Sequence, residues 1–307
     1  MNYQYKTSKI QLDNRKNIKK FLYFYSKNLL THSYKGSILW PSNTKESLKT
    51  KENNMKKLMV IALIAIAILA PIFAGGSKEE SSSEKVFTVA SSCDYPPLEY
   101  IDDNGNMVGY EIDLLNEIAK ITGVKFEIYN VAFDGIIAGI QGGQYDIGAS
   151  GFTVTEDRAK VVNFTEPNGA FTLSIVTQTA TEGLVDEKSL MGKKVGVQIG
   201  TTCQFACEDA GLTVSAYDDA PSAILDLANG NLDAVVIDNV VANDFVFNNE
   251  SYSKVLKVSG SFSNEDIMAI AVSKNKPEAL EAINEGLKVL KENGKLEELK
   301  AKYNFYF

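Results

Sequence analysis

Apolar and polar positions alternate with two different periods through the middle of the chain. Three short apolar runs bounded by turn residues predict buried strands at residues 86–91, 124–131 and 145–150. Apolar side chains at helical spacing predict helices at residues 111–121 and 133–141. Asn104-Gly105 predicts a tight hairpin between residues 98–101 and 107–110. A β-α-β-α-β order of this kind predicts a parallel sheet covered by helices.

The same order of elements restarts after residue 190. Strands are predicted at residues 194–198, 212–217 and 232–237. Helices are predicted after Gly200-Thr201 and at residues 221–229, 239–247, 277–290 and 295–303. Extended apolar segments are predicted at residues 171–179 and 267–272. We therefore expect two α/β lobes joined by two crossings, with residues 85–176 and 268–307 in lobe 1 and residues 177–267 in lobe 2.

The apolar run at residues 58–70 has a different character, because it follows Lys56 and Lys57 directly and is broken by Pro71. Its length fits the apolar part of a signal peptide, roughly 7–15 residues, better than a membrane span of about 20. We predict a signal peptide at residues 55–74, cleaved after Ala74, and a polar tether at residues 75–84. A retained membrane anchor is the alternative. No cysteine lies just after the run, the first being Cys93, so we do not expect a lipid anchor.

Charge separates the front of the chain from its body. Residues 1–74 hold 13 Lys and Arg against 3 Asp and Glu, whereas residues 75–307 hold 18 against 36. An acidic body of this kind repels nucleic acid. We hypothesise that Met55 is the true start and that residues 1–54 are a non-native upstream extension. N-terminal sequencing that finds residues before Met55 would contradict this.

Several chemistries are excluded by what the body lacks. His32 and Trp40, the only His and Trp, both precede Met55. The body therefore has no histidine for Ser-His-Asp or Cys-His catalysis, nor for a His-ligated metal site. Its cysteines are Cys93, Cys203 and Cys207, an odd number, and pairing of the last two stays open. We expect no metal and no cofactor.

Seven motifs in the expected order give the body a family likeness. They are ASSCDYPPLEY at residues 90–100, GYEIDLL at 109–115, FDGII at 133–137, YDIGASGFTVTEDR at 145–158, GKKVGVQIGTT at 192–202, GNLDAVVID at 230–238 and KENGK at 291–295. In these residues the chain resembles the polar amino-acid-binding proteins of ABC importers, bacterial extracellular solute-binding family 3. The resemblance implies an α/β type II periplasmic-binding-protein fold, two lobes with a hinged cleft. It also implies a periplasmic monomer that binds a free amino acid and delivers it to an ABC permease in the inner membrane.

Arg158 is the strongest single candidate for a ligand-binding residue. Residues 75–307 contain 17 Lys and only this Arg. Arg grips a carboxylate with a planar fork that Lys cannot supply. Together with the family's Thr-x-x-x-x-Arg spacing from Thr153, this predicts that Arg158 holds the ligand's α-carboxylate. The alternative is a surface residue at the start of a helix.

The resemblance assigns the rest of the amino-acid backbone to four residues. Thr153 is expected to add its hydroxyl and N–H to the carboxylate, and Thr202 a backbone N–H from a helix start, where anions are favoured. Asp238, at the end of a strand, is expected to bind the α-ammonium together with the Gly151 carbonyl. The alternative role for both Thr202 and Asp238 is a helix cap.

Five further residues are expected to face the ligand's side chain. They are Tyr95, Phe133, Ser92, Asp94 and Gln198. Tyr95 and Phe133 resemble aromatic walls, with ordinary core packing as the alternative. Many relatives that recognise basic or amide side chains have Asp at the position of Ser92, so Ser92 argues against a fully cationic ligand unless Asp94 substitutes.

We expect the protein to work by closure and not by catalysis, because the ligand's contacts come from both lobes and shift the equilibrium toward the closed form. The main alternative is a cyclohexadienyl or arogenate dehydratase-like enzyme, for which Glu99 or Asp94 would have to serve as the general acid. A second alternative is a sensor ectodomain, which normally carries a transmembrane segment and a signalling domain after its lobes.

Overall fold

A computed structural model describes residues 85–305, apart from the side chains of residues 263–265. The predicted upstream extension, signal peptide and tether lie outside the described residues, as do His32 and Trp40. The described residues belong to one compact unit, residues 80–307. Within the part of the chain that the structure describes, no helix combines the length and the apolar character needed to cross a membrane.

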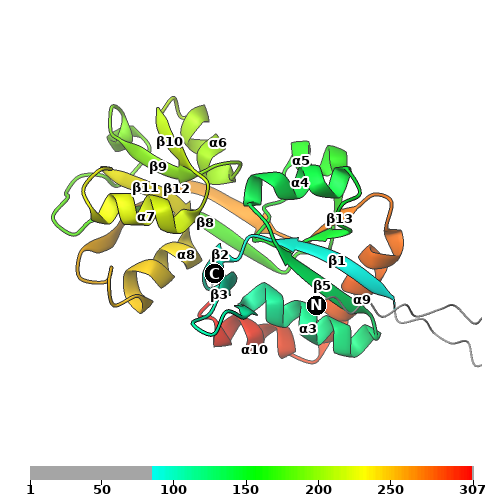
Figure 1. Cartoon of the computed structure of the whole chain (residues 1–307). Helices are drawn as coiled ribbons and strands as arrows, with labels where there is room; N and C mark the ends of the chain where they lie inside the picture. Colours follow the sequence, from blue (N-terminus) through cyan, green and yellow to red (C-terminus); the bar gives the residue numbers. More distant parts are fainter. Residues whose placement is uncertain (1–84, 306–307) are drawn as a thin grey trace, which may run out of the picture. The chain divides into compact units, whose positions relative to one another are not determined.

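The first sheet has the order β5-β1-β6-β13-β7. These strands are β1 (Val86–Ser91), β5 (Lys125–Asn130), β6 (Ile147–Gly148), β7 (Val162–Phe164) and β13 (Ala271–Ser273). β1, β5 and β6 are parallel, as predicted, but β13 runs antiparallel to β6 and β7. Figure 1 shows α4 (Phe133–Gln141) and α5 (Glu156–Val161) on one face, and α3 (Tyr110–Thr122) and α9 (Pro277–Glu292) on the other.

The second sheet has the order β10-β9-β11-β8-β12. Its strands are β8 (Gly169–Gln178), β9 (Val195–Gln198), β10 (Val214–Tyr217), β11 (Ala234–Asp238) and β12 (Leu256–Met268). The helices are α6 (Thr202–Asp209), α7 (Ala220–Ala228), α8 (Asn239–Asn243) with a π-helical extension at Asp244–Asn248, and a short 3-10 turn at Lys188–Leu190. Along β11, Ala234 and Val236 face one apolar core, whereas Val235 and Ile237 face the other. Both faces of the sheet therefore carry apolar side chains, and each face packs against a core of its own.

The long strands β8 and β12 pair with each other antiparallel along their length, from Gly169 opposite Met268 to Gln178 opposite Leu256. The sequence predicted one strand at residues 267–272, and this was wrong. β12 ends at Met268 in the second sheet and β13 starts at Ala271 in the first sheet. Ile267 is exposed, whereas residues 268–272 are buried as the chain passes from one sheet to the other, which explains the apolar run there.

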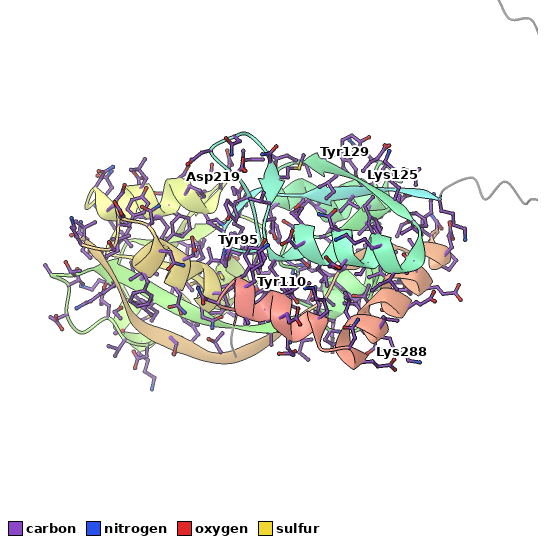
Figure 2. The ribbon with its side chains drawn as sticks, turned by 90° about the horizontal axis from the view of Figure 1, so that it is seen from below. Tyr95, Tyr110, Lys125, Tyr129, Asp219 and Lys288 are labelled. Carbon is purple, nitrogen blue, oxygen red and sulfur yellow. The ribbon has the colours of Figure 1, made fainter. Side chains whose placement is uncertain are left out.

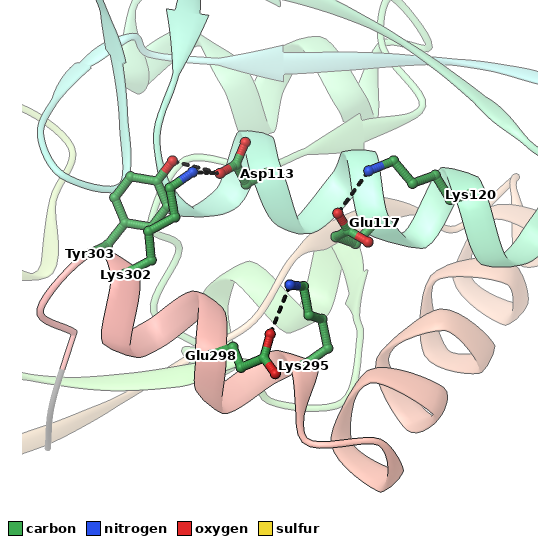
Figure 3. A network of polar contacts seen from close by, with 7 residues as sticks. All are labelled: Asp113, Glu117, Lys120, Lys295, Glu298, Lys302 and Tyr303. Atoms are coloured by element: carbon green, nitrogen blue, oxygen red, sulfur yellow. Dashed lines mark hydrogen bonds and ion pairs between the residues drawn. The ribbon is translucent and has the colours of Figure 1, made fainter.

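A small hairpin and the C-terminal helix complete the fold. β2 (Asp94–Tyr95), β3 (Glu99–Ile101) and β4 (Met107–Val108) form a small three-stranded sheet, and the hairpin of β3 and β4 confirms the predicted Asn104-Gly105 turn. The helix α10 (Lys295–Lys302) is fixed to α3 because Lys302 and Tyr303 both donate hydrogen bonds to Asp113 (Figure 3). α3 starts beside the candidate site, so this contact helps to hold its first turn in place.

Candidate functional site

All ten residues predicted to bind a ligand line one cavity. The structure adds Ser150 and Thr201, which the sequence analysis did not name. The complete lining is Ser92, Asp94, Tyr95, Phe133, Ser150, Gly151, Thr153, Arg158, Gln198, Thr201, Thr202 and Asp238. These residues come from loops and helix starts at the ends of strands in both sheets. Figure 2 shows Tyr95 in the interior, with Lys288 on the outside.

Arg158 lies in α5 and is only 9% exposed, so the alternative of a surface residue is wrong. Its Nη1 donates to the Thr153 carbonyl at 2.9 Å and its Nη2 to the Gly200 carbonyl at 3.0 Å. The guanidinium also lies over the rings of Phe133 and Phe152, with its Cζ 5.6 and 5.1 Å from their centroids. The fork is therefore held rigidly, and it connects α5 to the loop before α6.

Burial lowers the pKa of the Arg158 guanidinium, while the nearby carboxyl groups of Asp238 and Asp266 act in the opposite direction. An arginine pKa starts so high that the side chain stays charged. Both hydrogen bonds of its fork go to uncharged carbonyl oxygens. A buried cation in this setting favours an anionic group in the cavity beside it.

Thr153 and Thr202 meet across the cavity, with 3.3 Å between their hydroxyl oxygens. Thr201 is the residue that caps α6, because its side chain accepts the Gln204 N–H at 3.2 Å. The cap alternative for Thr202 is therefore wrong. Thr202 is the first residue of the helix, where backbone N–H groups have no partner within the helix.

Asp238 ends β11, as predicted, and is 5% exposed. Its carboxylate accepts the Tyr95 hydroxyl at 2.9 Å and lies 3.8 Å from the Cys203 Sγ. It makes no side-chain cap bond to α8, so the cap alternative is wrong here too. Burial raises the pKa of Asp238 to about 7, although the Tyr95 hydrogen bond opposes this. Any cation that enters the cavity would favour the ionised form.

The remaining polar residues gather at another part of the lining. The Ser92 hydroxyl donates to Asp94 at 2.9 Å, and the Gln198 amide reaches Asp94 at 3.5 Å. Burial raises the pKa of Asp94 to about 6, with a further contribution from Asp219. Phe133 stacks on Phe152 at 4.9 Å between ring centroids while it also borders the cavity. It therefore belongs both to the core and to the lining.

The pairing of Cys203 and Cys207 was left open, and the structure shows both as free buried thiols. Among residues 85–305, no cluster of His, Cys, Asp and Glu could hold a metal ion. Glu99, one of two candidate general acids for an enzyme, is fully buried behind the lining and does not reach the cavity. Only Asp94 of that pair borders it.

Known proteins share extensive sequence similarity with this chain. The sequence model of "Bacterial extracellular solute-binding proteins, family 3" matches residues 87–306. A probable histidine-binding protein of Neisseria gonorrhoeae is 29% identical over 258 residues, covering 81% of this chain and 96% of the relative. A putative ABC transporter arginine-binding protein 2 of Escherichia coli K12 is 31% identical over 259 residues, covering 82% and 99%.

The fold has a close match among solved structures. An ancestral arginine-binding protein bound to arginine superposes with a TM-score of 0.68 at 36% sequence identity. The match covers 72% of this chain and 98% of the other. The family match at residues 87–306 also spans every residue that lines the cavity.

Proposed function

This chain belongs to the bacterial extracellular solute-binding proteins of family 3, and from that premise we propose that it captures a free L-amino acid outside the cytoplasm for delivery to the permease of an ABC importer. Its fold is the predicted α/β type II periplasmic-binding fold. The single observation that carries the proposal is the enclosure of a buried cation, Arg158, and a buried carboxyl, Asp238, in one cavity. An amino acid brings the complementary pair of charges.

The backbone end of the ligand is assigned to five residues. Arg158, with Thr153 and the N–H of Thr202, receives the carboxylate, because a planar fork and a helix start both favour anions. Asp238, with the Gly151 carbonyl, receives the ammonium. Any L-amino acid presents these two groups, so these residues do not select among side chains.

The side-chain end is assigned to Ser92, Asp94, Tyr95, Phe133 and Gln198. Only two carboxyl groups line the cavity, and Asp238 is taken by the ammonium. Asp94 is then left to accept hydrogen bonds from the ligand, which favours a basic or amide side chain lying between the aromatic rings. Arginine-binding and histidine-binding relatives support this choice.

Ligand capture proceeds by closure of lobe 1 (residues 85–176 and 268–307) and lobe 2 (residues 177–267) about β8 and β12. Because each lobe supplies part of the lining, the ligand stabilises the closed form by its differential affinity. The closed monomer is then recognised by the permease, and the amino acid is released unchanged. Residues 55–74 direct export to the periplasm.

A thermal-shift screen against the common L-amino acids tests the proposal. We expect a stabilising shift with one or a few polar amino acids, since ligand that binds only the folded protein raises its stability. Absence of a shift with all of them, in protein with Arg158 intact, would contradict the proposed function. Turnover of prephenate or arogenate would favour the dehydratase alternative instead.

A further inference from the structure

Two carboxyl groups lie directly behind the cavity wall that Ser150 and Gly151 form. Glu99 and Glu111 are both fully buried. The Gly151 N–H donates to Glu111 Oε2 at 2.7 Å, the shorter contact of the two pairs. The Ser150 hydroxyl donates to Glu99 Oε1 at 3.1 Å and itself accepts the Ser92 N–H at 2.9 Å. Each carboxyl therefore holds one residue of the wall.

The two carboxyl groups cannot both be ionised at low cost. Within residues 85–305, neither of them forms an ion pair with a Lys or Arg. A charge on Glu111 raises the energy of a charge on Glu99. Both oxygens of Glu111 accept N–H groups, from Gly151 and from the Asn168 amide at 3.2 Å. Glu99 Oε2 has no hydrogen-bond partner. The charge is therefore better placed on Glu111 and the proton on Glu99.

The pKa directions agree with this assignment. Burial raises the pKa of Glu99 well above its ordinary value, and the charge of Glu111 raises it further. Burial also raises the pKa of Glu111, but the hydrogen bonds from Gly151 and Asn168 limit the rise to about 7. The other titratable groups that face the pair are Cys93 and Asp94, near Glu99, and Tyr110, near Glu111.

The position of Gly151 is coupled to the start of α3 and to Arg158. The Gly151 φ of +58° is left-handed, and a Cβ there would lie 3.1 Å from Leu98 Cδ1. Leu98 in turn fixes the start of α3, since its carbonyl accepts the Glu111 N–H at 3.0 Å. Two residues beyond Gly151, the Thr153 carbonyl receives Arg158. A shift of Gly151 would therefore move the carbonyl that holds the arginine fork.

We propose that Glu99 and Glu111 are positioning residues for the ligand that the proposed function assigns to this cavity: ionised Glu111 fixes Gly151, and protonated Glu99 fixes Ser150. Neither residue touches the ligand. Because only Glu111 is charged in this proposal, replacing each glutamate by glutamine affects ligand affinity to different extents.

The test compares Glu111→Gln with its matched control Glu99→Gln, by calorimetric titration with L-arginine, L-histidine and L-glutamine above the Glu111 pKa of about 7, where that carboxyl is ionised. Gln at position 99 reproduces a protonated carboxyl, so its affinity stays within about twofold of the wild type. Gln at position 111 keeps an acceptor for Gly151 but loses the charge, so affinity falls about threefold to tenfold, as the difference between charged and neutral hydrogen bonds implies. Equal affinities for the two variants would overturn the proposal.

The NMR chemical shift of the Gly151 amide proton reports on the same hydrogen bond in the absence of ligand. A hydrogen bond to a carboxylate moves the amide proton downfield, so the signal shifts upfield in Glu111→Gln and stays in place in Glu99→Gln. In the wild type it shifts upfield as pH falls through about 7, so the contact is measured even if Glu111→Gln does not fold. An amide that is insensitive to pH would overturn the proposal. If that signal moves as expected while no amino acid binds wild-type protein, the proposed function fails and the carboxyl contact stands.

Discussion

Arg158→Lys tests whether ligand binding needs the planar guanidinium group or only a positive charge. The guanidinium now bonds two carbonyls, those of Thr153 and Gly200, and lies over two aromatic rings. A single ammonium group on a flexible stem keeps the charge but cannot repeat this fixed, planar geometry. Burial also favours the neutral form of a lysine. Both effects weaken the hold on a carboxylate.

The expected loss follows from one hydrogen bond to a charged group, about 1.5–3 kcal/mol. This corresponds to roughly a 10-fold to 150-fold weaker Kd, at about 1.4 kcal/mol per factor of ten. Calorimetric titration with the amino acid that gives the largest thermal shift measures it. Lys160→Arg is the matched control, because Lys160 lies two positions further in the same helix and is 69% exposed; its Kd stays unchanged. An Arg158→Lys Kd within about threefold of the wild type would refute the carboxylate role.

Two further predictions concern pH and packing. Because Asp238 has a pKa of about 7 without ligand and must be ionised to bind an ammonium, affinity levels off above that pH and falls below it, by up to about tenfold per pH unit. Titrations from about pH 8, where the ligand's ammonium is still protonated, to about pH 5 check this, and a constant Kd would contradict it. Gly286→Ala would bring a Cβ to 2.7 Å from the Ile118 side chain, so it destabilises the protein by about 1–3 kcal/mol. Gly135→Ala, in a helix with open space around it, stabilises by about 0.5–1 kcal/mol. Urea unfolding of both variants measures the difference, and equal midpoints would show that the α3–α9 contact can relax.

Most of the fold was predictable because its strands and helices follow their apolar periods closely. β12 was not, because polar residues, above all those at 263–266, interrupt its few apolar positions. β12 is an edge strand of the second sheet, so its polar side chains can face solvent. The division of residues 267–272 between two sheets was equally hidden, because a continuous apolar run does not show where a chain leaves one sheet for another.

The candidate site was predictable in its members but not in its connections. Arg158 stood out as the single arginine after residue 74. Its bond to Gly200 could not be foreseen, because that bond joins loops of different sheets. Glu111 was also missed, since an acidic residue at the start of a helix usually faces solvent and interacts with the helix dipole. Only the structure shows it turned inward to Gly151.

The central claim is that Arg158 and Asp238 grip the two charges of an amino-acid backbone. The most direct test compares a bound L-amino acid with its methyl ester and its N-acetyl derivative in the same calorimetric titration. The ester lacks the carboxylate charge and the N-acetyl form lacks the ammonium, while both keep the side chain. We predict one-to-one binding of the free amino acid and no measurable binding of either derivative. Binding of the ester or the N-acetyl form as tight as that of the free amino acid would contradict the account.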